Sequence, residues 1–154
     1  MIFVTVGTTH FDPLIKEVDR LKSTGIIEDD VIAQIGEGQY IPKHLQWFRY
    51  TDDMHRYYKE SRLCICHGGV GSIYELLYLG KEFIAVANRD LKDDHQSDLL
   101  KALMKRNWCR CCLHLEELEV ALRNPFVLEP YRLEQNLASH LWGKAIASMS
   151  QVSS

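Results

Sequence analysis

Short, mostly apolar runs alternate with longer amphipathic stretches along most of the chain. Continuous apolar runs of this kind are typical of parallel strands that are covered on both faces of a sheet. They predict strands at Ile2–Val6, Val31–Ile35, Trp47–Tyr50, Leu63–Cys66, Phe83–Ala87 and Cys109–Leu113. The stretches between them carry apolar residues at helical spacing, so most of these strands are expected to lead into a helix.

The predicted helices begin and end at recognisable signals. Asp12 and Pro13 form a cap followed by a proline in the first turn, and Gly25 ends the helix that they begin. The other predicted helices are 51–59, capped by Thr51, then 72–79, 95–106, 115–122 and 132–149. Strands alternating with helices imply an α/β fold with a doubly wound, Rossmann-like parallel sheet. One domain then spans 1–149, followed by a disordered tail at 150–154.

Two apolar stripes allow more than one interpretation. Met54, Tyr57 and Tyr58 recur at helical spacing, which is typical of a core or an interface. In the predicted terminal helix, leucines repeat every four residues from Leu133 to Leu141. That stripe fits packing against the domain itself and docking on a partner equally well.

The segment from Leu63 to Gly80 combines a buried strand, a glycine turn and a helix. Gly68, Gly69 and Gly71 allow a tight turn and a close approach of backbone to a ligand. Ser72 is a natural N-cap, and Glu75 three residues later completes a capping-box pattern. The first turn of a helix directs unpaired N–H groups and the positive end of its dipole outward, so this segment predicts a phosphate site.

This signal has structural alternatives. The turn lacks the lysine of a P-loop, and Tyr74 stands where GxGxxG has its third glycine. A glycine turn between a strand and a helix is also common as plain structure. Glu75 could be occupied by the capping box, or it could accept hydrogen bonds from a pair of sugar hydroxyls.

Two further polar loops follow predicted strands. Gly7, Thr8, Thr9 and His10 follow the first strand, and the residues from Asn88 to Gln96 follow the fifth. In a doubly wound sheet, ligands bind beyond the carboxyl ends of the strands, where the winding reverses. We therefore expect both loops to meet the glycine turn at one site, although the first is also compatible with an ordinary polar loop.

Composition and charge narrow the class of protein. The chain has 154 residues, 46% hydrophobic and 25% charged, as expected of one globular domain. Its net charge of −3 does not indicate a nucleic-acid surface. No apolar run approaches the roughly 18 residues of a membrane span, and Met1 leads directly into a strand. We expect a cytoplasmic protein whose contact with a membrane is peripheral or made through a partner.

The five cysteines support that compartment, because an odd number in closely spaced pairs does not suggest a disulfide framework. Cys64 and Cys66 lie on one predicted strand, and Cys109, Cys111 and Cys112 on another. Alternate positions on a strand share a face, so such a pair could bind a metal, but the C-x-x-C spacing of zinc knuckles is absent. Buried, reduced, structural cysteines are the favoured interpretation.

Three linked motifs resemble a known family. FVTVGTTHFDPLI, HGGVGSIYELLYLGK and NRDLKDDHQSDLL occur in that order over roughly the first hundred residues. They resemble the UDP-sugar donor-binding half of glycosyltransferase family 28. The resemblance is greatest to the short catalytic subunits of split, two-polypeptide transferases that act in dolichyl-diphosphate N-acetylglucosamine transfer or bacterial exopolysaccharide synthesis. It implies a single GT-B half-domain.

The resemblance also implies roles for individual residues. The backbone of the glycine turn would hold the UDP diphosphate without a metal or other cofactor, and Glu75 would bind the ribose. Gln96, with Asn88, Asp94 and His95, would face the sugar. The implied donor-binding residues are Gly7, Thr8, Thr9, His67, Gly68, Gly69, Val70, Gly71, Ser72, Glu75, Asn88, Asp94, His95 and Gln96. His67 also fits a neutral ring bonded to a backbone carbonyl.

The implied reaction is an inverting transfer from a UDP-sugar to a lipid-diphosphate-linked sugar. A family-28 transferase has two facing domains, so a membrane-anchored, acceptor-binding subunit is expected as partner. The base that deprotonates the acceptor hydroxyl would come from that partner, with His10 as the local candidate. Two alternatives remain, a non-catalytic nucleotide-sugar-binding subunit and a UDP-sugar epimerase or hydrolase.

Overall fold

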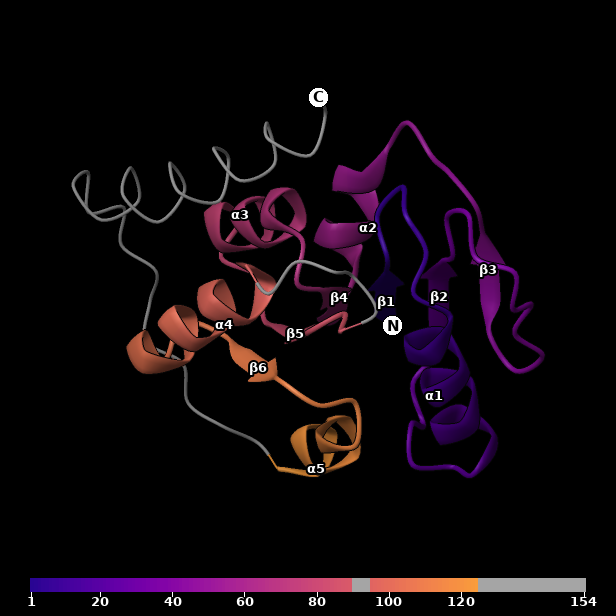
Figure 1. Cartoon of the computed structure of the whole chain (residues 1–154). Coiled ribbons are helices and arrows are strands. Elements are labelled where there is room, and N and C mark those ends of the chain that lie inside the picture. The colour runs from indigo at the N-terminus through magenta and orange to yellow at the C-terminus, as the bar shows by residue number, and fades with distance from the viewer. Residues whose placement is uncertain (90–94, 125–154) are drawn as a thin grey trace.

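The chain forms a parallel sheet with helices on both faces, as the alternating pattern predicts (Figure 1). The structure is a computed structural model, and it describes residues 1–89 and 95–124. In this part of the chain the strands are β1 (Ile2–Thr5), β2 (Val31–Gln34), β3 (Gln46–Phe48), β4 (Leu63–His67), β5 (Phe83–Val86) and β6 (Arg110–Cys112). Their order is β3-β2-β1-β4-β5-β6, and every neighbouring pair is parallel. The winding therefore reverses between β1 and β4.

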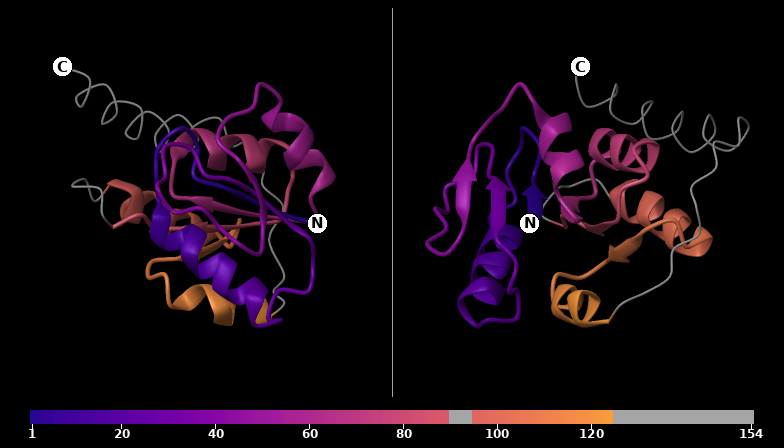
Figure 2. Two further views of the ribbon diagram at one scale, coloured as in Figure 1. Left: turned by 90° about the vertical axis from the view of Figure 1, so that its right-hand side faces the viewer. Right: turned by 180° about the vertical axis from the view of Figure 1, so that it is seen from behind.

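Helices cover the sheet on both sides (Figure 2). They are α1 (Asp12–Ser23), α2 (Met54–Glu60), α3 (Val70–Tyr78), α4 (His95–Arg106) and α5 (Glu117–Arg123). The helices α1 and α5 pack on one face, and α2, α3 and α4 pack on the other. Side chains alternate between the faces of a strand, so Val4 of β1 packs with the first group and Phe3 with the second. Two apolar cores result, which explains why the strands are apolar throughout.

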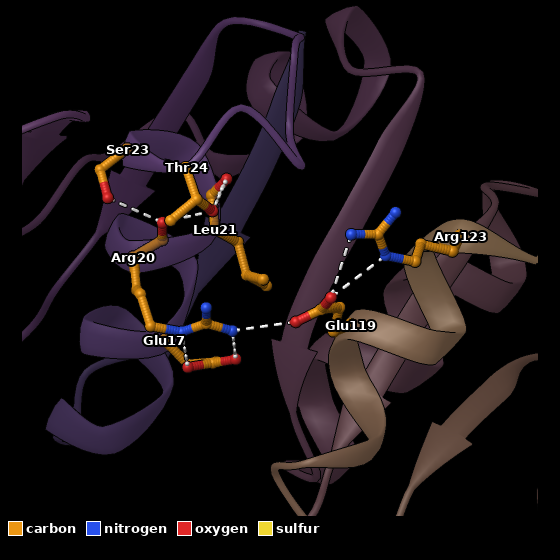
Figure 3. Close-up of polar contacts among 7 residues, drawn as sticks. All are labelled: Glu17, Arg20, Leu21, Ser23, Thr24, Glu119 and Arg123. Atoms are coloured by element: carbon orange, nitrogen blue, oxygen red, sulfur yellow. Dashed lines mark hydrogen bonds and ion pairs between the residues drawn. The ribbon is translucent and has the colours of Figure 1, made fainter.

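Charged side chains connect α1 to α5 across the outside of their shared face (Figure 3). Arg20 lies 3.0 Å from the Glu119 carboxylate and 2.8 Å from Glu17, and Arg123 lies 3.1 Å from Glu119. The arginines are exposed and the carboxylates partly exposed, and ion pairs at such positions contribute little to stability. They link the helix that follows β1 to the helix that follows β6.

Several element boundaries differ from the sequence prediction. Strand β3 spans Gln46–Phe48 rather than 47–50, because its register is fixed by pairing with β2. Helix α2 is capped by Asp53, whose carboxylate accepts a hydrogen bond from the backbone N–H of Arg56. The Thr51 hydroxyl accepts from the backbone N–H of Asp53, which lies before the helix. Thr51 as the helix cap was therefore wrong. The predicted helix at 132–149 and the tail at 150–154 lie outside the described residues.

The cysteines behave as predicted, since all five are free thiols in the buried core. Burial raises the pKa of the Cys64 thiol and, more strongly, that of Cys66. Within residues 1–89 and 95–124, no cluster of three or more His, Cys, Asp or Glu is placed to hold a metal ion. In the same residues, no helix has the length and apolar character needed to cross a membrane.

Candidate functional site

Loops from β1, β4 and β5 meet at the carboxyl edge of the sheet, beside the point where the winding reverses. Gln96 at the start of α4 lies against the turn after β4, because a Cβ added to Gly68 would lie 2.8 Å from its Oε1 atom. The same oxygen accepts a hydrogen bond from the backbone N–H of Asn88 at 3.2 Å. Asn88 in turn donates through Nδ2 to the His10 carbonyl at 3.3 Å. The predicted convergence of three loops is confirmed for these residues.

The turn after β4 passes directly into α3. Gly69 is the N-cap in an extended conformation (φ −73°, ψ 132°), and the helix begins at Val70. Ser72 therefore lies within the first turn, so its prediction as the N-cap, and the capping box with Glu75, were wrong. Gly69 has no side chain to accept from the first-turn amides, and α3 has no acidic residue there. Those N–H groups, together with the helix dipole, favour an anion at this point.

The glycines of this turn have different surroundings. A Cβ on Gly69 would lie 2.6 Å from Nε2 of His67, which is too close for real atoms. Gly71 is exposed, and a Cβ there would meet nothing within 4 Å. Packing against His67 thus requires a glycine at position 69, whereas no contact inside the described protein requires one at position 71. Open space beside unpaired amides is what a bound phosphate needs.

His67 lies beneath this turn and is 8% exposed. Its ring also contacts the turn after β1, since a Cβ on Gly7 would lie 3.2 Å from its Cε1 atom. Burial lowers the pKa of His67, and the nearby Thr5 backbone only partly opposes that effect. Nδ1 has no hydrogen-bond partner among the described residues. The neutral ring therefore contacts both glycine turns, beside the Thr5 backbone that partly opposes the effect of burial.

Glu75 projects from the second turn of α3 toward α2. Its Oε1 atom lies 3.5 Å from Nδ1 of His55, and its side chain is 41% exposed. No capping box occupies the carboxylate, because the helix begins two residues before Ser72. An exposed carboxylate one turn from the anion site is free to accept hydrogen bonds from a ligand.

The turn after β1 is closed by its own hydrogen bonds. The Gly7 amide donates to the Thr5 hydroxyl at 3.0 Å, and the Thr9 hydroxyl donates to the Val6 carbonyl at 3.0 Å. Asp12 is the first residue of α1 rather than its cap, and its Oδ2 atom accepts from the amides of Gln39 and Tyr40. The predicted site residues Thr8 and His10 are exposed at this loop.

Two predicted site residues can be only partly placed. His95 is the first residue of α4, and Asp94 lies outside the described residues. One neighbour of the site was missed by the sequence analysis, namely His55 in the first turn of α2. Its position on a helix that follows a parallel strand is the signal that would have indicated it, because such helices begin at the ligand edge of the sheet.

Comparison with known proteins places the chain in a family. The profile of the glycosyltransferase family 28 C-terminal domain matches residues 1–141. The chain belongs to this family. The matched part includes all three loops of the site, and the resemblance stated from the sequence motifs is confirmed.

Family 28 relatives include larger proteins. The chain is 37% identical to the human UDP-N-acetylglucosamine transferase subunit ALG13 over 124 residues, covering 71% of this chain and 11% of that protein. The mouse protein of the same name is 35% identical over 123 residues, covering 71% and 10%. The chain thus spans about a tenth of the length of these two relatives.

Solved structures agree on the fold. An NMR structure of ALG13 has a TM-score of 0.63 and 21% identity, covering 90% of this chain and 92% of that one. The crystal structure of MurG from Acinetobacter baumannii has a TM-score of 0.60 and 22% identity, covering 80% and 41%. At these identities the likeness shows the fold alone. The chain therefore has the fold of one half of a GT-B glycosyltransferase.

Proposed function

We propose that this family 28 chain is the donor-binding, catalytic subunit of an inverting UDP-sugar transferase. The observation that carries the proposal is the turn after β4, where α3 begins without a side-chain cap at the reversal of the sheet. Family membership supports the reaction class, and the names of the human and mouse relatives specify a UDP-N-acetylglucosamine transferase subunit. From those names, N-acetylglucosamine is the sugar proposed for this chain.

The diphosphate of the donor binds between Gly68 and Ser72, at the turn after β4 and the first turn of α3. The amides and dipole of the helix stabilise the bound anion and the charge that develops on UDP as it leaves. Within this proposal the binding requires no divalent metal. His67 keeps the turn in shape as a neutral ring, so it adds no charge of its own.

The remaining donor contacts come from two helices. Glu75 accepts hydrogen bonds from the ribose hydroxyls, for which its paired oxygens are suited. Gln96 faces the transferred sugar, and its side chain is aligned by the hydrogen bond from the backbone N–H of Asn88. Asp94 and His95 belong to the same sugar-facing group in this proposal. The Gly7 to Thr9 loop lies beside the phosphates.

The acceptor is a lipid-diphosphate-linked sugar, held by a membrane-anchored partner subunit. Its hydroxyl attacks the anomeric carbon of the donor from the face opposite UDP, the bond to the diphosphate oxygen breaks, and the hydroxyl proton passes to a base. The partner supplies that base, and His10 is the candidate on this chain. Activity then requires both subunits, which act at the cytoplasmic face of a membrane.

Gly71→Ala tests where the donor binds. Apart from the backbone of its own helix, the new methyl group meets nothing within 4 Å among the described residues, and alanine favours helix by up to about 1 kcal/mol. The free energy of unfolding should therefore stay the same or rise. UDP affinity, measured by calorimetry in the presence of a chelator, should fall about tenfold because the methyl group occupies ligand space.

Three other results would contradict the proposal. Unchanged UDP affinity in Gly71→Ala would place the ligand elsewhere. Loss of wild-type binding on addition of the chelator would contradict the metal-free site. Turnover of a UDP-sugar by this chain alone, without acceptor or partner, would favour an epimerase or hydrolase instead.

A further inference from the structure

Helices α2 and α3 meet through two pairs of side chains near the candidate site. His55 and Tyr58 are three residues apart on α2, and Ser72 and Glu75 are three residues apart on α3, so each pair shares one face of its helix. His55 Nδ1 lies 3.5 Å from Glu75 Oε1. The Tyr58 hydroxyl makes a polar contact with the Ser72 side chain. Both helices follow parallel strands, so both first turns lie at the ligand edge (Figure 1).

The deeper of these pairs fixes the spacing of the helices. Tyr58 is 1% exposed and packs edge-on against Phe3 of β1, with ring centroids 5.8 Å apart. Its neighbour Tyr57 stacks on the same ring, with centroids 5.1 Å apart, and packs in a tilted arrangement against Phe48 of β3 at 4.9 Å. Helix α2 is therefore anchored to the sheet by aromatic packing, which limits its freedom to move relative to α3.

The outer pair cannot serve folding to any large extent. The side chains of His55 and Glu75 are 48% and 41% exposed, and ion pairs at such positions contribute little to stability. Their geometry has a clearer consequence for a ligand. With Oε1 turned toward the imidazole, the other carboxylate oxygen keeps its acceptor sites for a ligand.

We propose that His55 is a positioning residue for Glu75, holding the carboxylate in the orientation that accepts from the donor ribose. This inference rests on the proposed function, in which Glu75 binds the ribose. His55 acts through Glu75 and does not itself contact the ligand. The anchored helix α2 supplies the rigidity that this role needs.

A double-mutant cycle on the full chain tests the inference, with UDP as the probe and calorimetry as the measurement. His55→Leu removes the polar ring atoms at similar bulk and should weaken UDP binding about three- to fivefold. His55→Gln retains a donor and should restore most of that loss. In a Glu75→Gln background, His55→Leu should change UDP affinity no further, because the group that it positions is already altered.

Arg56→Leu is the matched control, because Arg56 is the next residue on α2 and pairs with Glu60 at 2.9 Å. It should leave UDP affinity unchanged. If His55→Leu binds UDP as the wild type does while Glu75→Gln binds it more weakly, the positioning role is overturned and the proposed function stands. An equal loss in both backgrounds would mean direct contact with the ligand and would also overturn it. Failure of the wild type to bind UDP would overturn the proposed function itself.

Discussion

Two strand-turn-helix units lie side by side at the centre of the sheet, and their glycine turns differ in one decisive respect. The turn between β1 and α1 uses its polar groups internally, through the Gly7 amide and the hydroxyls of Thr5 and Thr9. It is also tied to the turn after β2, because the Thr9 carbonyl accepts from the Glu37 amide at 3.0 Å. Neither α1 nor α3 has a side-chain N-cap hydrogen bond, but the turn between β4 and α3 lacks the hydroxyl side chains that close the β1 turn.

The first turns of the two helices reinforce this difference. Helix α1 begins with Asp12 and has Pro13 in its first turn, so a negative charge and a missing N–H group reduce its attraction for an anion. Helix α3 begins with Val70 and Gly71 and has no acidic residue in its first turn. Similar local patterns thus produce a turn after β1 that supports the fold and a turn after β4 that is suited to an anion.

The largest effect is expected from Gly36→Ala, which breaks the supporting turn. Gly36 has φ +53°, and an added Cβ would lie 2.2 Å from the Thr9 carbonyl oxygen and 3.0 Å from that of Gly7. Left-handed strain and the clash with backbone should together lower the free energy of unfolding by about 3 kcal/mol. Urea denaturation of the variant measures this loss.

Gly25→Ala is the matched control for that variant. Gly25 also has positive φ, +78°, but an added Cβ would meet nothing within 4 Å. Only the left-handed strain of about 1 kcal/mol should then appear. Equal losses in the two variants would show that the contact between the Gly36 turn and the Thr9 loop does not support the fold.

A smaller effect is expected from the pH dependence of His67, the ring shared by both turns. Burial lowers the pKa of His67, so the unfolded chain binds more protons than the folded chain below about pH 6.5. The free energy of unfolding should therefore fall as pH decreases from about 6.5 toward the folded pKa. His67→Gln should flatten this dependence, and the exposed His114→Gln should retain it. If the free energy of unfolding of His67→Gln still falls with pH as in the wild type, another group is responsible for the dependence.

Asp19 titrates in a separate, more acidic range, which keeps the two effects apart. Burial by itself would raise the pKa of this carboxyl, but hydrogen bonds from the Tyr40 hydroxyl and the amides of Lys43 and His44 outweigh burial and hold the pKa below its usual value. Its contribution to stability is complete above the unfolded pKa of about 3.9 and is lost as pH falls through the folded value.

Much of the fold follows from the sequence because apolar runs report burial directly. The order of strands and helices was predicted, and with it the edge of the sheet where the loops meet. The start of α3 was not, because Ser72 with Glu75 and Gly69 with Val70 are both acceptable helix starts. Gly71 has low helix propensity, which favoured the later start, but the extended conformation of Gly69 determines the earlier one.

The finer organisation of the site depends on contacts that sequence patterns do not contain. His55 and Glu75 are on different helices, and their proximity follows from the packing of Tyr57 and Tyr58 on Phe3. The internal hydrogen bonds of the β1 turn also cannot be read from the sequence GTTH, which predicted only a polar loop that meets the glycine turn. The ligand roles of all these residues stay predictions.

The smallest expected effect sharpens the comparison between the turns. Thr8 is exposed on the β1 turn, beside the proposed phosphates but away from the internal hydrogen bonds of the loop. Thr8→Ala should leave the free energy of unfolding within about 0.5 kcal/mol of the wild type. It should weaken UDP binding by at most about threefold, near the low end for one neutral hydrogen bond.

Thr9→Ala is the structural counterpart, because it removes the hydroxyl that donates to the Val6 carbonyl and should cost about 1 kcal/mol of stability. The UDP affinity of the folded variant should fall no further than that of Thr8→Ala. Calorimetry and urea denaturation of the two threonine variants and of Gly71→Ala compare how much each turn contributes to UDP affinity and to stability. A loss of UDP affinity in Thr8→Ala as large as in Gly71→Ala would mean that the β1 turn also cradles the diphosphate. The proposed division between a supporting turn after β1 and a binding turn after β4 would then fail, because the Thr8 hydroxyl would hold the anion as firmly as the amides of α3.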